Sequence, residues 1–311
     1  MTEPSTDATA FRGVMPALVT PMRSDGEINW DALLDQTEWV LTHGVHGVVP
    51  CGTTGESATL SADEQRAVIE RVVQIVGGRV PVVAGAGGND TRRVAELAAA
   101  AAEAGADGIL SVTPYYNRPS IEGLVEHYRA VAEAADRPVI LYNVPSRTGR
   151  DMTPDEVFRI AEAVPGVVGI KEASGKIDRF STLLAERPSD FLVFSGDDEL
   201  AFPAMAMGAE GVISVVANEA PGPMSDMADG LREGRLDDAR AIHLRLLAVM
   251  RANFVTTNPV PVKTALQLMG RAPAFFRLPL TPLQVGDPAL VTLRTALEEA
   301  GLIETVTLAS R

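Results

Sequence analysis

Cysteine is almost absent from this 311-residue chain, and Cys51 is the only one. A lone thiol excludes an internal disulfide framework and is typical of a protein that works in a reducing cytoplasm. No apolar run approaches the ~18 residues that a membrane-spanning helix needs. Residues 1–10 are polar and acidic, which is unlike a signal peptide. We therefore expect a cytoplasmic protein without a membrane partner.

Positive charge is also scarce, with 27 Lys and Arg against 41 Asp and Glu and a formal net charge of -14. This balance argues against a nucleic-acid partner, because phosphate binding depends on clustered Lys and Arg. Lysine is the rarer cation, since the chain contains only Lys171, Lys176 and Lys263. Arginine serves a surface ion pair equally well but cannot form a Schiff base, which draws attention to the few lysines.

Short apolar runs of strand-like composition recur along the chain, with a helical pattern between each pair. The runs cover residues 14–19, 47–51, 80–85, 108–112, 139–142, 167–171, 191–195 and 211–216. Such alternation over about 230 residues fits an α/β fold of the closed (β/α)8 TIM-barrel type, whose typical size is ~250 residues. A doubly wound open sheet is the rival, but it usually has a glycine-rich phosphate loop after its first strand. Here Thr20-Pro21 follow that strand, so the barrel is preferred.

Start signals mark several of the intervening helices. Residues 61–64 form a capping box ahead of an apolar-periodic stretch, and residues 153–156 form a second, with Pro154 at the first helical position. Beyond residue 234 the strand pattern disappears, and helical patterns cover 236–250, 261–269 and 288–300. We divide the chain into a disordered tail (1–10), a catalytic barrel (11–234) and a C-terminal helical domain (235–311) without an active site of its own.

The sixth predicted strand ends in Lys171. Lysine is rarely buried, because removing an ammonium from water costs several kcal/mol. At a strand end it either pairs with a neighbouring acid or lies in a cleft, where a desolvated amine can attack a carbonyl carbon. The function of a barrel enzyme resides at the carboxyl ends of its strands, so the residues that follow the other strands decide between the two.

The second predicted strand is followed by Gly52-Thr53-Thr54-Gly55. The two glycines let the backbone turn tightly and present N–H groups beside the threonine hydroxyls, which suits a small carboxylate. The structural alternative is an ordinary glycine turn that leads into a capped helix.

Aromatic and cationic residues follow the fourth and fifth predicted strands. Tyr115 and Tyr116 precede Arg118, although aromatics in a loop often only pack at an interface. Tyr142 ends the fifth strand, where it can donate and accept a proton near a reacting carbon. Arg147 can hold a carboxylate with two parallel hydrogen bonds.

Acidic residues follow the seventh predicted strand, at Asp197-Asp198-Glu199. Such acids are typical of the first turn of the next helix, and none of the four histidines stands beside them at metal-ligand spacing. We predict no metal site. Cys51 has no partner base nearby in the sequence and is interpreted as a small buried residue.

The strand-end lysine, the tyrosine, the Gly-Thr-Thr-Gly turn and the arginine together describe one reaction type. An amine condenses with a 2-oxo acid, the imine loses a proton to give an enamine, and the enamine attacks an aldehyde.

Five motifs in order resemble the pyruvate-dependent lyase and aldolase family that includes N-acetylneuraminate lyase. They cover residues 52–57, 114–119, 142–149, 169–172 and 211–218. Arg147 in its Ser-Arg-Thr-Gly context and the run 258–263 favour one branch. Its members condense pyruvate with L-aspartate 4-semialdehyde to 4-hydroxy-tetrahydrodipicolinate in lysine and diaminopimelate biosynthesis. The resemblance thus implies an enzyme, a carbon–oxygen lyase with a class I aldolase mechanism.

The resemblance also implies a role for each catalytic residue. Lys171 forms the Schiff base with pyruvate, and Tyr142 is the general acid and base. Thr53 connects Tyr142 to Tyr116 in a proton relay, in which the partner subunit donates Tyr116 across a tight dimer interface.

Substrate binding is implied for a second set of residues. Thr54 and the backbone of the turn from Gly52 to Gly55 bind the pyruvate carboxylate, and Arg147 binds the semialdehyde. Arg118 lies near the mouth of the site, and the backbone carbonyl of Ile213 faces the lysine. No metal or organic cofactor is implied beyond the covalent pyruvate imine, and the usual assembly is a homotetramer, a dimer of dimers.

Many relatives carry a lysine feedback pocket beside the residue that is Tyr115 here. Ser57, Ala58 and Asn89 match that pocket. Two expected histidines are replaced by Ala62 and Gln65, and an expected acid by Arg93. We expect an enzyme that is insensitive to lysine.

Three alternatives remain open from the sequence. A sister aldolase or dehydratase would use the same Lys171 enamine on a sugar acid or hydroxy-oxo acid. A non-catalytic sensor would bind a 2-oxo acid on the same scaffold, since a fold does not fix an activity. A metal-dependent aldolase would lose activity in a chelator.

Overall fold

The computed structural model describes residues 10–304. Of the tail expected at residues 1–10, only Ala10 lies within that range. Seven parallel strands form one sheet in the order β1-β7-β6-β5-β4-β3-β2. The strands are β1 (Gly13–Pro16), β2 (Val83–Gly85), β3 (Gly108–Val112), β4 (Val139–Asn143), β5 (Val167–Glu172), β6 (Leu192–Ser195) and β7 (Gly211–Ser214). The predicted α/β class with a parallel sheet is confirmed.

The strand predicted at residues 47–51 is not one of the seven strands of the sheet. Only Val48 and Val49 are extended there, and each makes one parallel bridge, to Val82 and Ala17 respectively. The extended stretch ends early because the chain turns at Pro50 and Cys51 has a left-handed φ of 56°. This short segment nevertheless lies between β1 and β2, the two edges of the sheet.

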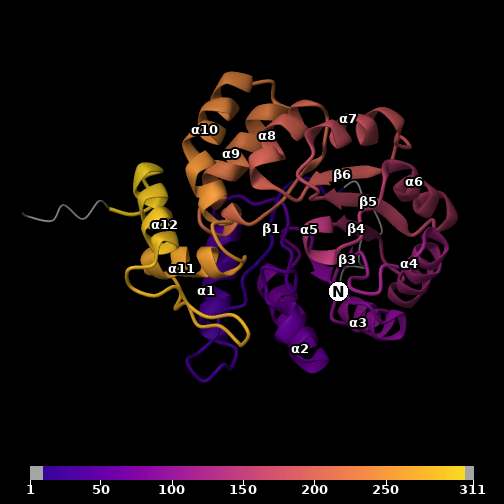
Figure 1. The fold of residues 1–311 in the computed structure, drawn as a ribbon, viewed down its shortest axis with the longest axis horizontal. Coiled ribbons are helices and arrows are strands. Elements are labelled where there is room, and N and C mark those ends of the chain that lie inside the picture. The colour runs from indigo at the N-terminus through magenta and orange to yellow at the C-terminus, as the bar shows by residue number, and fades with distance from the viewer. Residues whose placement is uncertain (1–9, 305–311) are drawn as a thin grey trace, which may run out of the picture.

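Helices follow the strands and surround the sheet (Figure 1). They are α1 (Trp30–Thr42), α2 (Ala62–Val76), α3 (Thr91–Glu103), α4 (Ile121–Ala135), α5 (Pro145–Thr148), α6 (Pro154–Ala163), α7 (Ile177–Glu186), α8 (Asp198–Ala206) and α9 (Pro221–Arg232). Both predicted capping boxes are confirmed: Ser61 with Glu64 opens α2, and Thr153 with Glu156 opens α6. Two short 3-10 turns, η2 (Ser57–Thr59) and η3 (Val216–Asn218), lie in the loops.

Side chains of the strands alternate between two apolar clusters, because successive residues of a strand point to opposite faces. Leu141 and Ile170 belong to the cluster that the helices cover. Ile140 and Tyr142 belong to a second cluster on the inner face of the sheet, together with Phe194. Lys171, which follows Ile170, therefore points to the inner face.

The C-terminal segment is helical, as predicted, with α10 (Leu236–Ala252), α11 (Val260–Leu268) and α12 (Pro288–Glu299). These helices, orange to yellow in Figure 1, lie beside α1, α8 and α9. α10 packs against α8, α9 and α12, and α11 contacts η3. Within residues 10–304, none of the helices is long and apolar enough to span a bilayer.

Candidate active site

A cavity of about 650 Å3 lies where the central strands end. Residues at or just beyond the ends of β4, β5, β6 and β7 line it, and so does the turn after Val49. Five of the predicted site residues are among its lining: Thr53, Thr54, Tyr142, Arg147 and Lys171. A second cavity of about 390 Å3 shares Thr53, Tyr142 and Arg147 with it. The structure therefore brings together predicted site residues as distant in the sequence as Thr53 and Lys171.

Lys171 and Tyr142 form a pair in the wall of this cavity. They stand opposite each other in the β4–β5 register, and Lys171 Nζ lies 4.3 Å from the centroid of the Tyr142 ring. Both are buried, at 5% and 8% exposure. Within residues 10–304, Lys176 and Lys263 each pair with a carboxylate, whereas Lys171 forms no ion pair. The structural reading of Lys171 as one half of a strand-end ion pair is therefore wrong for the described chain.

Gly196, directly after β6, makes room for the lysine side chain. A Cβ atom at this position would stand 2.9 Å from Lys171 Cε and 2.7 Å from the Cβ of Ala173. Both separations are shorter than carbon atoms tolerate, so the close approach of backbone and lysine requires glycine here.

The turn after Val49 presents its threonines to the cavity. Gly55 is closely packed, because a Cβ there would stand 3.1 Å from the carbonyl oxygen of Leu18. Thr54 is buried, and its Oγ1 accepts a hydrogen bond from Asn258 Nδ2 at 3.0 Å. Gly52 and Thr53 are half-buried beside it. The turn thus carries two hydroxyl groups at the wall of the cavity.

Arg147 lies in the short helix α5, which follows β4. Its Nη2 donates a hydrogen bond to the carbonyl oxygen of Asn258 at 3.1 Å. Arg118 lies beside the same loop, since a Cβ at Gly149 would stand 3.0 Å from Arg118 Nη2. Arg118 itself lines neither of the two cavities.

Tyr116 and Ile213 are not among the residues that line the two cavities. Tyr116 is 90% exposed, has a left-handed φ of 73° and lines neither cavity of its own chain. Ile213 is buried in β7, and its side chain belongs to the inner apolar cluster. Val215, two residues further along the chain, lines the cavity. The relay through Tyr116 and the position of the Ile213 carbonyl stay predictions.

One wall of the cavity is formed by residues that the motifs did not predict. This wall comes from the connection between α10 and α11 and lies in the same cavity as Thr54 and Lys171. Its residues are Phe254, Thr256, Thr257 and Asn258. These residues belong to the segment that was predicted to carry no active site of its own. The Asn258-Pro259 break was the available signal, but nothing in its pattern places it beside residues 200 positions earlier.

The acidic residues after β6 each have a structural partner. Asp197 caps α8, with Oδ1 accepting from the Glu199 N–H at 2.9 Å. Asp198 Oδ2 accepts from the N–H groups of Val215 and Val216, both at 2.9 Å, and Glu199 pairs with Arg251. Burial raises the pKa of Asp197 and of Asp198. The helix-start interpretation of these acids is confirmed, because Asp197 is the N-cap of α8 and Asp198 and Glu199 lie in its first turn.

Cys51 lines the smaller cavity but is buried. Burial raises the pKa of its thiol to about 12, so the thiolate is disfavoured at neutral pH. This environment agrees with the prediction of a small buried residue.

These observations define a class first: a parallel α/β protein with a buried lysine–tyrosine pair at neighbouring strand ends. The sequence model of the Dihydrodipicolinate synthetase family matches residues 10–300, and the chain belongs to this family. The 4-hydroxy-tetrahydrodipicolinate synthase of Nitratidesulfovibrio vulgaris (strain DP4) is 48% identical over 293 residues, which cover 94% of this chain and 99% of that protein.

Solved structures agree with the assignment to this family. The chloride-inhibited dihydrodipicolinate synthase of Acinetobacter baumannii, solved as a complex with pyruvate, superposes with a TM-score of 0.91. It is 43% identical, and the match covers 94% of this chain and 99% of that one. The dihydrodipicolinate synthase of Thermotoga maritima also gives a TM-score of 0.91 at 41% identity, over 94% of this chain and all of that one.

Proposed function

We propose that the chain condenses pyruvate with L-aspartate 4-semialdehyde to 4-hydroxy-tetrahydrodipicolinate, in lysine and diaminopimelate biosynthesis. The chain is a lyase of the class I aldolase type. The observation that carries the proposal is the buried pair of Lys171 and Tyr142, in which Lys171 Nζ lies 4.3 Å from the centroid of the Tyr142 ring. The cavity that the pair lines, at about 650 Å3, is large enough for both substrates. Membership of a family whose relatives carry the synthase name supports it.

In the proposed reaction, Lys171 Nζ attacks the keto carbon of pyruvate, and loss of water gives the imine. Tyr142 accepts and returns the protons of this step. Removal of a proton from the methyl group converts the imine to an enamine. The enamine carbon then forms a bond to the aldehyde carbon of the semialdehyde, whose oxygen takes up a proton. The amine of the semialdehyde finally attacks the imine carbon, which closes the ring and releases Lys171 unchanged.

The remaining site residues are proposed to hold the two substrates. The Thr54 hydroxyl and the backbone from Gly52 to Gly55 bind the pyruvate carboxylate. Arg147 binds the carboxylate of the semialdehyde. Arg118, which lies in the connection between β3 and α4 and beside Gly149, acts at the mouth of the site.

Proton transfer and the electrostatics of the lysine are assigned to three further groups. The Ile213 carbonyl faces the imine nitrogen. Thr53 relays protons between Tyr142 and a Tyr116 that comes from a second subunit. The exposure of Tyr116, at 90%, supports such an exchange between chains.

The finer architecture is part of the same proposal. The segment of Val48 and Val49 is hydrogen-bonded to both edges of the sheet. The Val49 N–H donates to the carbonyl oxygen of Pro16 in β1, and the Val83 N–H in β2 donates to the carbonyl oxygen of Val48. We assign this segment as the eighth strand of a closed (β/α)8 barrel over residues 11–234. The helical domain predicted at residues 235–311 follows the barrel, and residues 305–311 lie outside the described chain. A homotetramer built as a dimer of dimers, a cytoplasmic location and catalysis with no cofactor beyond the pyruvate imine complete the proposal.

Pyruvate consumption by the purified protein tests the function directly. Aspartate semialdehyde, N-acetylmannosamine and glyceraldehyde are offered in separate reactions, with and without a chelator. Strong preference for the semialdehyde is expected, and the chelator should change nothing. Turnover of a sugar aldehyde would instead assign the protein to the sister aldolases.

Two variants sharpen the test. Borohydride with pyruvate should trap an adduct on Lys171, and no adduct should form in Lys171→Met. Absence of an adduct in the wild type would leave only a binding protein. Arg147→Ala should raise KM for the semialdehyde about 10- to 100-fold, the loss of one charge-assisted contact. Arg159→Ala, which removes an exposed pair with Glu122, is the matched control.

A further inference from the structure

A second pair of residues lies directly behind Lys171 and Tyr142. Asn143 follows Tyr142, Glu172 follows Lys171, and the two stand opposite each other in the β4–β5 register. Because side chains alternate along a strand, they point away from the cavity, toward the helices. Asn143 Nδ2 donates a hydrogen bond to Glu172 Oε2 at 3.0 Å, and both residues are almost fully buried, at 0% and 1% exposure. The hydrogen bond joins the ends of the two strands that carry the reactive pair.

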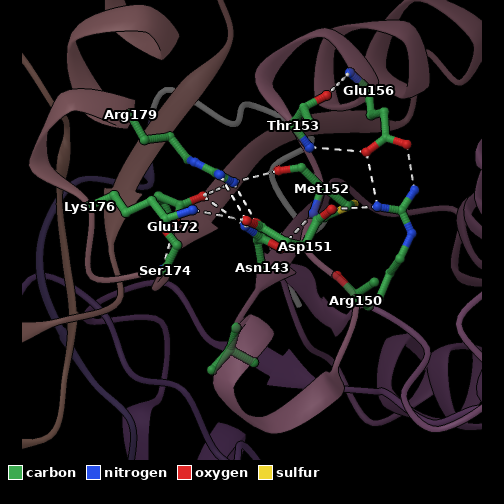
Figure 2. Close-up of polar contacts among 12 residues, drawn as sticks. Asn143, Arg150, Asp151, Met152, Thr153, Glu156, Glu172, Ser174, Lys176 and Arg179 are labelled. Carbon is green, nitrogen blue, oxygen red and sulfur yellow. Dashed lines mark hydrogen bonds and ion pairs between the residues drawn. The ribbon is translucent and has the colours of Figure 1, made fainter.

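The orientation of Asn143 is fixed by further bonds (Figure 2). Its Nδ2 also donates to Asp151 Oδ1 at 3.0 Å, and its Oδ1 accepts from the Met152 N–H at 3.1 Å. The amide therefore cannot turn over without losing all of these contacts. Asp151 is held in turn by Arg179, whose two terminal nitrogens donate to its two oxygens at 2.6 and 2.9 Å.

Glu172 reaches the cavity wall through its other oxygen. Glu172 Oε1 accepts from the Ser174 N–H at 2.6 Å, which fixes the turn of Ala173, Ser174 and Gly175 that lines the cavity. Arg179 lies 3.9 Å from Glu172 Oε2 and supplies the nearest positive charge. Burial raises the pKa of Glu172, so this carboxylate is held there at a cost.

An apolar pair of similar volume would stabilise the two strands equally well, since buried charges seldom add net stability. What hydrogen bonds add is a fixed geometry, and displacement of a reacting group by ~1 Å can cost about 100-fold in rate. The network contacts the residues next to Lys171 and Tyr142 but neither side chain itself. Its contribution is therefore to the position of the pair.

We propose that Asn143 and Glu172 are positioning residues, which hold Lys171 Nζ against Tyr142 and fix the 173–175 wall of the cavity. This inference rests on the proposed imine chemistry of Lys171. It assigns no contact between either residue and substrate.

Glu172→Gln is the direct test. Both carboxylate oxygens accept hydrogen bonds, so a glutamine must present its NH2 group to a donor at one of the two. We expect kcat and the rate of borohydride-trapped imine formation to fall together by about 10- to 100-fold. KM for aspartate semialdehyde should stay unchanged, because Arg147 is outside the network.

Glu156→Gln is the matched control, because Glu156 is also half of an ion pair in the same region, with Arg150 (Figure 2). It bonds the Thr153 N–H at 3.0 Å but contacts neither strand end. This variant should keep kcat within about twofold of the wild type, because it loses the charge while a glutamine oxygen can still accept from the Thr153 N–H and close the capping box. Thermal unfolding of both variants shows whether their stabilities are comparable.

The outcomes separate the two hypotheses. A wild type without an adduct on Lys171 refutes the proposed function. A wild-type adduct with an unchanged rate in Glu172→Gln, or equal losses in Glu172→Gln and Glu156→Gln, overturns the positioning role alone. If Glu172→Gln does not fold, Asn143→Ser decides by the same criteria, since it removes the strand-to-strand bond and leaves the Glu172–Ser174 bond.

Discussion

Lys263, in α11, forms a buried ion pair with Glu56, in the turn that carries Thr53 and Thr54. Their side chains are only 2% and 1% exposed. Lys263 Nζ also donates a hydrogen bond to the carbonyl oxygen of Thr20 at 3.1 Å. Burial lowers the pKa of Lys263, and the negative charge of Glu56 opposes that shift. The C-terminal segment is thereby tied to the proposed pyruvate-binding turn.

Lys263→Met should lower the free energy of unfolding by about 3–5 kcal/mol, because it leaves the Glu56 carboxylate buried without its partner. The double variant Lys263→Met, Glu56→Met should recover most of that loss, since neither charge then remains. Urea unfolding followed by circular dichroism measures both. Arg66→Met breaks the exposed pair with Glu70 and should cost no more than about 1 kcal/mol. Equal losses in the single and double variants would contradict the prediction.

Most of the fold could be predicted because parallel strands buried on both faces appear as short apolar runs. All seven strands coincide with such runs, and the ends differ by a few residues. The run at residues 47–51 contributes only two bridged residues, because a left-handed turn at Cys51 follows Pro50 and ends the extended stretch after Val49. Local composition does not reveal that conformation.

The cavity could be predicted in part for a similar reason. Parallel strands end at one edge of a sheet, so Tyr142 and Lys171 had to be neighbours once the strands were placed. The wall from Phe254 to Asn258 could not be predicted in this way. The bond between Asn258 and Thr54 joins residues 204 positions apart, and it depends on how α11 packs and not on any repeat in the sequence.

His127 should make the stability of the protein depend on pH. Burial lowers the pKa of His127 to about 4, whereas an unfolded histidine has a pKa near 6.5. Between these values the unfolded chain binds a proton that the folded chain does not, so stability falls as the pH falls from about 6.5 to 4. The difference between the folded and unfolded pKa of His127 corresponds to about 3 kcal/mol in the free energy of unfolding. Unfolding titrations should show this slope in the wild type and a shallower slope in His127→Gln. A ring titration near pH 6.5 by NMR would contradict the assignment.

Lysine should not inhibit the enzyme. The smaller cavity, with a volume of about 390 Å3, contains most of the residues compared with the lysine pocket: Ser57, Gln65, Asn89, Arg93 and Tyr115. An arginine in this position repels the ammonium of lysine, and like-charge contacts cost several kcal/mol. Initial rates should therefore be unchanged by added lysine, whereas Arg93→Glu should introduce weak inhibition. An inhibition constant in the submillimolar range for the wild type would refute the expectation.

Gly196→Ala should displace Lys171 without unfolding the protein. The added methyl group would meet Lys171 Cε at 2.9 Å and Ala173 Cβ at 2.7 Å, so the lysine side chain must move. We expect borohydride trapping and kcat to fall about 10- to 100-fold. Gly222→Ala is the control, because its Cβ would be 3.7 Å from His43 Cδ2, in ordinary contact, and alanine favours the helix α9. The control should keep full activity and gain up to about 1 kcal/mol of stability. Equal trapping rates in both variants would show that the lysine tolerates the methyl group, and that the contact with Gly196 does not set its position.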